Sequence, residues 1–281
     1  MRIERAALIE KREQEVRELP KENNHRSKKN KRRHKKSMSS VVQKLFDTCK
    51  EVFAHGGAGI IPSEMDVERI KSVLDSMSPS DVGLNEEMPF FKTLETEGAP
   101  PITYLHLYEC DKFSMGIFCL PPRAVIPLHN HPGMTVFSKI LLGSMHIRSF
   151  DWTDIPQNTS DQLNPTHFQP AGVRLAELKK NTVFTAPCDT SLLYPAAGGN
   201  LHRFTAVTAC AVLDVLGPPY CDSEGRHCAY YQEFPYASFS GDDSVAPVDS
   251  ERYAWLEEKD NPDNLFVVGA PYLGPRITET E

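Results

Sequence analysis

Short runs rich in β-branched and aromatic residues fill the chain from Ile102 to about Tyr236, and they constrain its fold more than any other feature. Each run ends at Gly, Pro or Asp, residues that favour turns, and examples are ITYLHLYEC, FSMGIFCLPP, TVFSKILLGSMHIRSF and FTAVTACAVLDVLGPP. Many short strands with regular turns predict an all-β sandwich or barrel. The sequence has no βαβ alternation and no glycine-rich phosphate loop, which argues against a nucleotide-binding sheet.

Two short amphipathic helices are predicted ahead of this β-rich region. Apolar residues recur at helical spacing from residue 41 to residue 53, and Gly56 and Gly57 supply a stop. A second helical pattern covers residues 64–77, where Ser63 followed by Asp66 is typical of a capping box. We therefore expect two helices to precede the sheet.

The charge of the chain is unevenly distributed. The first forty residues carry 14 Lys and Arg against 6 Asp and Glu, whereas the remainder carries 17 against 32. The basic segment ends in KKNKRRHKK, residues 28–36, a cluster typical of nuclear localisation signals or of phosphate contacts. We expect residues 1–38 to be disordered and to direct the protein to the nucleus and cytoplasm. Direct nucleic-acid binding is not expected, because the acidic remainder would repel phosphates.

Composition also bears on the compartment. No window approaches the length of about 18 apolar residues that a membrane helix needs, and the first residues are polar where a secretory signal would be apolar. The seven cysteines are scattered without a CxxC pair, so we expect reduced thiols in an intracellular protein without disulfides. Residues 39–281 are predicted to form one domain, and we expect a monomer with no membrane contact.

Two histidines, His129 and His131, stand two residues apart in the apolar stretch VIPLHNHPGMTVFSKILLGSMHI. On a strand, residues at this spacing point to the same face, so both imidazoles could bind one divalent metal. A third histidine, His202, follows a Pro-Gly turn in YPAAGGNLHRFTAVTA. Two hairpin-linked strands of a small barrel could bring the three side chains together in its mouth. A histidine of this kind can also be a hydrogen-bonded core or surface group without a metal.

These motifs resemble those of the cupin superfamily. The first motif is matched by Pro127, His129, His131 and Gly143, and the second by Pro195, Gly198 and His202. The resemblance implies a double-stranded β-helix barrel, mostly β, preceded by the two helices and the basic segment.

The chain departs from many cupins in lacking a glutamate four or five residues after the second histidine. Thr135 and Val136 occupy those positions. Three neutral imidazoles leave the charge of a divalent metal uncompensated, so an anionic ligand such as a thiolate is favoured.

A closer resemblance is to thiol dioxygenases of the cysteamine dioxygenase and plant cysteine oxidase type. It covers nearly all of residues 40–260, and it is carried by PLHNHPGMTVFSKILLGSMHI, YPAAGGNLHRFTA, AVLDVLGPPY and GRHCAYYQEFPY. Features of the plant branch are VQKLFDTCKEVFA, TAPCDTSLLYP and YAWLEE.

This resemblance implies an iron-dependent enzyme. In the family, Fe(2+) held by three histidines adds both atoms of O2 to the sulfur of an N-terminal cysteine on a protein. The sulfinic product marks the target for the N-degron pathway, so the enzyme acts as an oxygen sensor in the hypoxia response. The implied partners are therefore O2 and proteins or peptides with an N-terminal cysteine, including transcription factors.

The resemblance also implies roles for individual residues. His129, His131 and His202 would bind the iron. Asp214 would lie beside the site and hold a ligand or meet the substrate amine, although a strand-end acid in a turn is the simpler interpretation of this residue. Tyr220 matches an aromatic residue at the edge of the pocket.

Cys228 and Tyr230 form a C-x-Y pair on one predicted strand face, and they match residues that some relatives cross-link. A buried thiol beside a buried phenol is the alternative without a cross-link.

Two functions of other classes remain open from the sequence. The first is a zinc or manganese cupin that acts as an isomerase or hydrolase, because a three-histidine zinc site keeps an open position for water. The second is a non-catalytic nuclear binding module that uses the basic segment as its working surface.

Overall fold

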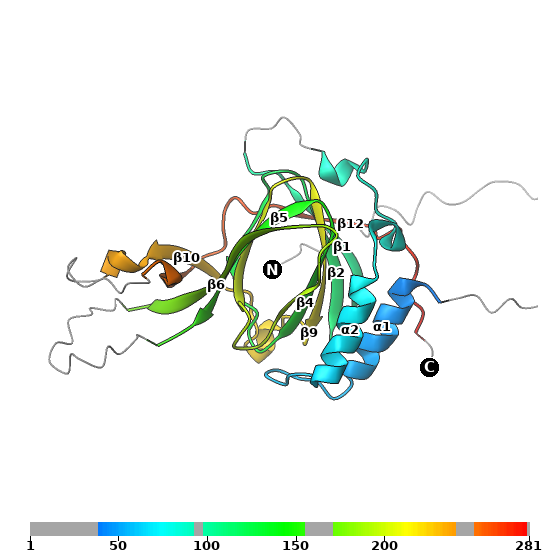
Figure 1. Ribbon diagram of the computed structural model, residues 1–281, viewed down its shortest axis with the longest axis horizontal. Coiled ribbons are helices and arrows are strands. Elements are labelled where there is room, and N and C mark those ends of the chain that lie inside the picture. The colour runs from blue at the N-terminus through cyan, green and yellow to red at the C-terminus, as the bar shows by residue number, and fades with distance from the viewer. Residues whose placement is uncertain (1–38, 93–97, 155–170, 240–249, 280–281) are drawn as a thin grey trace, which may run out of the picture. The chain divides into compact units, whose positions relative to one another are not determined.

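Two layers of β-strands form the body of the protein in the computed structural model (Figure 1). The structure describes residues 39–92, 98–154, 171–239 and 250–279, so the predicted basic segment of residues 1–38 lies outside the described residues. In chain order the strands are β1 (Ile102–Glu109), β2 (Ser114–Leu120), β3 (Val125–His129), β4 (Thr135–Leu142), β5 (Ser144–Trp152), β6 (Val173–Thr185), β7 (Ser191–Leu193), β8 (Leu201–Ala206), β9 (Cys210–Gly217), β10 (Tyr230–Pro235), β11 (Tyr253–Lys259) and β12 (Val267–Ala270).

The strands are divided between a sheet and a closed barrel. The sheet has the order β12-β1-β2-β9-β4-β7, and the barrel has the order β10-β11-β6-β5-β8-β3. Neighbouring strands are antiparallel, except that β12 lies parallel to β1 at the edge of the sheet. The predicted mostly-β, cupin-type barrel is therefore confirmed.

Both predicted helices are present, and each begins at a serine cap. Helix α1 (Val41–Val52) starts at Ser40, whose hydroxyl accepts a hydrogen bond from the Gln43 amide at 3.1 Å. Helix α2 (Glu64–Asp75) starts at Ser63, whose hydroxyl accepts from the Asp66 amide at 3.2 Å and donates to its carboxylate at 2.8 Å. These bonds satisfy amide groups that have no partner within the helix.

The two helices lie side by side over the sheet that contains β2, β4 and β9 (Figure 1). Their apolar faces bury side chains against that sheet and form the largest described core cluster, which includes Leu45, Phe46, Ile70, Leu74, Ile117, Phe137 and Leu213. Burial of this apolar area is the main stabilising contribution at this face.

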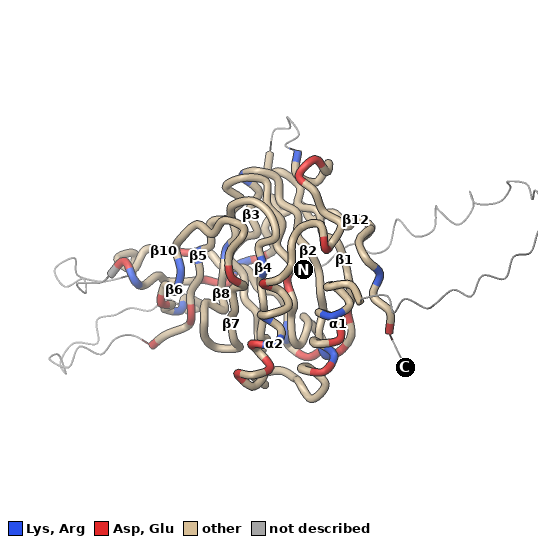
Figure 2. The backbone as a smooth tube through the Cα atoms, turned by 45° about the vertical axis from the view of Figure 1, so that its right-hand side comes forward, with Lys and Arg blue, Asp and Glu red and all other residues tan. Residues whose placement is uncertain are grey.

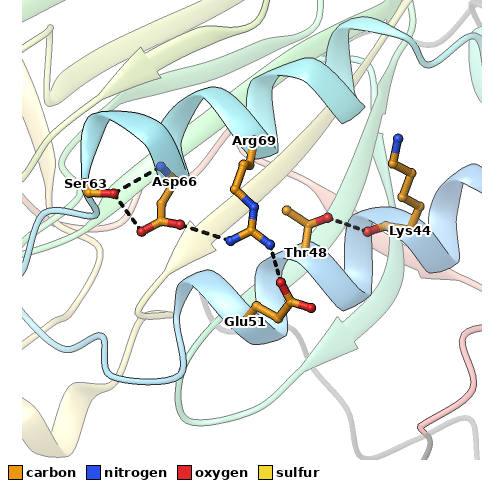
Figure 3. Close-up of polar contacts among 6 residues, drawn as sticks. All are labelled: Lys44, Thr48, Glu51, Ser63, Asp66 and Arg69. Carbon is orange, nitrogen blue, oxygen red and sulfur yellow. Dashed lines mark hydrogen bonds and ion pairs between the residues drawn. The ribbon is translucent and has the colours of Figure 1, made fainter.

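Polar contacts also join the helices on their outer side (Figure 3). Arg69 of α2 forms ion pairs with Glu51 of α1 and with Asp66. The side chains of Arg69 and Glu51 are 42% and 64% exposed, so solvent screening limits the contribution of this pair to stability. The apolar contact therefore dominates the docking of the helices. Among the described residues, no helix has the length and apolar character needed to span a membrane.

We expect Phe46→Ala to lower the free energy of unfolding by about 3 to 5 kcal/mol, because the ring is fully buried between α1 and the sheet. Urea denaturation followed by circular dichroism measures this loss. Met65→Ala is the matched control, since the Met65 side chain on α2 is 73% exposed and its removal should change stability by less than about 0.5 kcal/mol. Equal losses in the two variants would contradict the packing described here.

Candidate metal centre

Direct pairing of β3 with β8 brings together two of the three predicted histidines. His129 is the last residue of β3, and it is the cross-strand partner of His202 on β8. The two strands are paired but not linked by a hairpin, because β4 to β7 lie between them in the chain. Their imidazole ring centres are 4.7 Å apart. The prediction that they meet is therefore correct, whereas the predicted hairpin connection is wrong.

His131 reaches the same place from a turn. The sequence pattern predicted that His129 and His131 share one strand face, but β3 ends at His129. Pro132 and Gly133 turn the chain, with a φ of 68° at Gly133, and the Met134 amide donates to the His131 carbonyl at 3.2 Å. The ring centres of His131 and His202 are nevertheless 4.7 Å apart, so the turn completes the cluster.

The three histidines form a compact and buried group. Each is at most 5% exposed, and one ring nitrogen from each lies within 4.8 Å of the others. The Nε2 atoms of His131 and His202 are 3.0 Å apart. Three converging imidazole nitrogens at this spacing are the donor set that a divalent transition metal needs, so the residues fit a metal ion.

Hydrogen bonds on the outer side of two rings fix which nitrogen faces the centre. The Pro127 carbonyl lies 2.8 Å from Nδ1 of His129 and can only accept, so this Nδ1 carries the proton. Tyr220 donates its hydroxyl proton to the Asn130 carbonyl at 2.7 Å, and its oxygen lies 3.0 Å from Nδ1 of His131. Nδ1 of His131 is thus also a donor, and both Nε2 lone pairs are available to a metal.

Burial keeps the imidazoles in the form that binds metal. Desolvation lowers the pKa of His129 to about 4, and the same cause holds the pKa values of His131 and His202 well below their usual range. Metals bind neutral imidazole, so no proton has to leave these rings near neutral pH.

An asparagine that the sequence analysis did not single out connects the two histidine motifs. The side-chain oxygen of Asn200 accepts from the His131 amide at 3.1 Å, and its nitrogen donates to the carbonyls of His131 and Tyr194 at 2.9 and 2.8 Å. Asn200 is 7% exposed, so these bonds replace water contacts that the buried backbone of His131 cannot make. The residue therefore holds His131 against the segment that precedes His202.

Asp151 on β5 fixes the Asn200 segment in turn. Its Oδ1 accepts from the amides of Gly199 and Asn200, both at 2.9 Å. Gly199 has a φ of 91°, and a Cβ atom there would lie 2.3 Å from the Ser149 hydroxyl. Only glycine fits this close approach. Signals for this arrangement were present in the sequence as Gly-Gly-Asn directly before the strand of His202, but the partner Asp151 is distant in the chain.

Asp214 lies in the middle of β9 and not at a strand end, so the simpler sequence interpretation is wrong. It is buried, Ser138 hydrogen-bonds to its carboxyl group, and Oδ1 has no hydrogen-bond partner among the described residues. Desolvation raises its pKa to about 7, against the opposing effect of the Ser138 hydrogen bond. No hydrogen bond joins it to the three histidines among the described residues, so it does not orient a ligand directly.

Tyr220, Cys228 and Tyr230 form a second group beside the histidines. Tyr220 is bonded to His131 and so lies behind a ligand, a more specific position than the predicted pocket edge. Cys228 precedes β10, which begins at Tyr230, so the prediction that both share a strand face is wrong. The Cys228 thiol nevertheless interacts electrostatically with both tyrosines, and burial raises the pKa of each of the three groups. The structure thus shows a half-buried thiol beside two phenols.

We expect Asn200→Ala to weaken metal binding by about 10- to 100-fold, because it frees the His131 backbone, leaves its buried amide without a partner and removes one of the two donors to its carbonyl. Cobalt(II) titration of metal-free protein, followed by visible absorption, measures the affinity. The control Asn261→Ala alters an exposed residue and should bind cobalt as the wild type does. An unchanged affinity in Asn200→Ala would show that Asn200 does not hold the ligand.

The raised pKa of Asp214 predicts a pH-dependent gain in stability for Asp214→Asn. The folded carboxyl binds its proton more tightly than the unfolded one, so its stabilising contribution is complete below about pH 4 and is lost as the pH rises through 7. The excess stability of Asp214→Asn over the wild type should therefore grow by about 2 to 3 kcal/mol from pH 5 to pH 8. Urea unfolding of both metal-free proteins tests this, and a constant difference would contradict it.

Comparisons with known proteins agree with this geometry. Residues 73–277 match the PCO_ADO family. Plant cysteine oxidase 1 of Arabidopsis thaliana is 56% identical over 85% of this chain and 81% of that protein. Plant cysteine oxidase 2 of the same plant is 53% identical over 93% and 92%, and human 2-aminoethanethiol dioxygenase is 29% identical over 86% and 98%. The chain therefore belongs to the PCO_ADO family, and it is a thiol dioxygenase.

Proposed function

We propose that this thiol dioxygenase uses Fe(2+) and O2 to oxidise the N-terminal cysteine of target proteins to cysteine sulfinic acid. The observation that carries the proposal is the buried cluster of His129, His131 and His202, which offers neutral nitrogen ligands and no carboxylate. Such a site leaves the charge of a divalent ion uncompensated and so favours an anionic sulfur ligand. Iron bound there would lower the pKa of the substrate thiol and allow its sulfur to react with O2.

The substrate class follows from two relatives. Their names specify cysteine and 2-aminoethanethiol, which share a free amine two carbons from a thiol. An N-terminal cysteine presents the same unit at the end of a peptide. Asp214 supports this class, since its unpartnered Oδ1 can accept a hydrogen bond from a substrate ammonium group.

The chain supplies orientation and proton positions for this reaction. Nδ1 of His129 and Nδ1 of His131 donate to Pro127 and Tyr220, which turns each Nε2 toward the centre. Asn200 keeps the backbone of His131 in place. Both oxygen atoms of O2 are transferred to sulfur, and the thiol itself provides the electrons, so no further reductant is required.

The cellular role is part of the same proposal. A sulfinic N-terminus would mark the target for the N-degron pathway, and dependence on O2 would make the enzyme an oxygen sensor in the hypoxia response. We infer transcription factors as targets, a monomeric enzyme and a location in nucleus and cytoplasm. The basic cluster of residues 28–36 supports nuclear import, and it lies outside the described residues.

Oxidation of three matched peptides tests the substrate assignment. Iron-loaded enzyme should add two oxygen atoms to a peptide with a free N-terminal cysteine, as measured by mass spectrometry. The N-acetylated peptide and a peptide with an internal cysteine should react at least about tenfold more slowly, because the cysteine has no free amine in either of them.

His202→Ala is the control, and it should lose both bound metal and activity, because two remaining ligands hold a labile ion weakly. Equal rates for the three peptides would refute recognition of the N-terminus. Full activity with zinc or manganese, or activity in His202→Ala, would refute the iron assignment.

A further inference from the structure

A large groove lies on the outer side of the barrel strands. Its volume is about 1040 Å³, and strands β3, β5, β6, β8, β10 and β11 contribute to its walls. Apolar side chains line part of it, among them Leu128, Leu178 and Tyr231. Two more apolar residues at the groove are unusually open to solvent, with Val125 37% and Phe266 55% exposed. We call this cavity the outer groove.

The outer groove is separate from the three-histidine site. Successive side chains of a strand point to opposite faces, so Leu201 and Arg203 face away from His202 between them. Leu201 belongs to the apolar cluster that contains Leu128, and Arg203 lines the outer groove. The same segment of β8 thus serves the metal site on one face and the groove on the other.

Two arginines stand directly opposite each other in the groove. Arg148 of β5 and Arg203 of β8 are cross-strand partners, an arrangement of like charges that destabilises a sheet. Glu233 of β10 is shared between them: both its oxygens accept hydrogen bonds from Arg148, whereas its contact with Arg203 is a longer ion pair without a hydrogen bond. Arg203 is 3.8 Å from Glu233, is 40% exposed, and donates no side-chain hydrogen bond to any residue within the described ranges. One guanidinium in the groove is therefore available to an anion.

The charged side chains that line the groove are positive on balance. Its described lining holds four basic side chains, of Arg123, Arg148, Arg203 and Lys259, against two acidic ones, of Glu233 and Glu251. The chain after residue 40 has the opposite balance, with 17 basic and 32 acidic residues. Figure 2 shows basic residues beside acidic ones around β5, β6, β8 and β10. The outer groove is thus a basic patch on an acidic protein.

We propose that the outer groove binds an acidic peptide segment of a partner protein. Carboxylates of the segment would pair with Arg203, Arg123 and Lys259, since guanidinium groups bind carboxylates with two parallel hydrogen bonds. Apolar residues between the acids would contact Tyr231 and Phe266. An extended segment uses both kinds of lining, whereas a compact inorganic anion would leave the apolar residues unused.

The acidic surface selects against polyanions of high charge density. At physiological ionic strength, charges separated by more than about 8 Å are largely screened, so a short acidic segment senses mainly the basic groove. A nucleic acid extends far beyond the groove and would meet the surrounding acidic residues along its whole length. Charge complementarity therefore favours a peptide as the occupant.

Fluorescence anisotropy with the full-length, metal-loaded protein tests the proposal. The probe is a labelled synthetic peptide in which glutamates alternate with leucine and phenylalanine. The comparison probes are the same peptide with lysine in place of glutamate, inorganic phosphate as a competitor, and a labelled single-stranded oligonucleotide. We expect saturable binding of the acidic peptide that weakens as salt is added, and no binding of the basic one.

Arg203→Gln separates binding from folding. It removes a charge that is only weakly paired with Glu233, together with its repulsion of Arg148, so the melting temperature should stay the same or rise while peptide affinity falls about tenfold. Arg123→Glu, at the exposed rim of the groove, should also weaken binding without changing thiol oxidation. Lys44→Gln, an exposed position on α1, is the matched control and should bind as the wild type does. Figure 3 shows this residue on the helix pair.

Three results would overturn the proposal. They are a failure of the wild-type protein to bind the acidic peptide, unchanged affinity in Arg203→Gln, and equal binding of the oligonucleotide or displacement by phosphate. The last result would assign the groove to a phosphate ligand. Whether the groove binds a peptide or a phosphate, we expect the groove variants to keep thiol oxidation, because the groove and the histidines lie on opposite faces of β8.

Discussion

The antiparallel contact between β3 and β8 is the interaction on which the rest of the site depends. It places His129 opposite His202, with their ring centres 4.7 Å apart. His131 lies beyond the end of β3, so its position cannot come from the strand ladder. Asn200 supplies the missing constraint by bonding both backbone polar groups of His131, and Asp151 anchors Asn200 in turn. The cluster is therefore built from hydrogen bonds between loops as much as from strand pairing.

Local patterns allowed part of this structure to be predicted. The apolar spacing of α1 and α2 and the capping serine Ser63 are contained within single segments, and both helices form where these patterns indicate. The three histidines were also found from their spacing and from the family resemblance. The predictions that failed concern geometry that depends on residues far apart in the chain. The turn at Pro132 and Gly133 ends β3 earlier than the pattern of alternating residues suggests.

Other features of the site could not be predicted from the sequence, because they also depend on contacts between residues far apart in the chain. Asp214 looked like a strand-end acid because Gly217 and Pro218 follow it closely, yet pairing with β2 and β4 buries it in the centre of the sheet. The hydrogen bond from His131 to Tyr220 joins residues 89 positions apart. Neither residue carries a local signal for its partner. Contacts of this kind are set by the order of strands, which composition and periodicity do not determine.

Buried polar groups without partners destabilise the folded state, so their presence at the site indicates a role other than stability. The carboxyl of Asp214 has an unpartnered oxygen, and the hydroxyl of Ser149, the cross-strand neighbour of His202, is likewise buried without a partner among the described residues. Natural proteins pair most such groups, because each unsatisfied one destabilises the folded state. Polar groups of this kind beside imidazoles whose charged forms are suppressed are what a site would need to receive a polar substrate. Selection for stability alone would have filled this space with apolar side chains, as it has beneath α1 and α2.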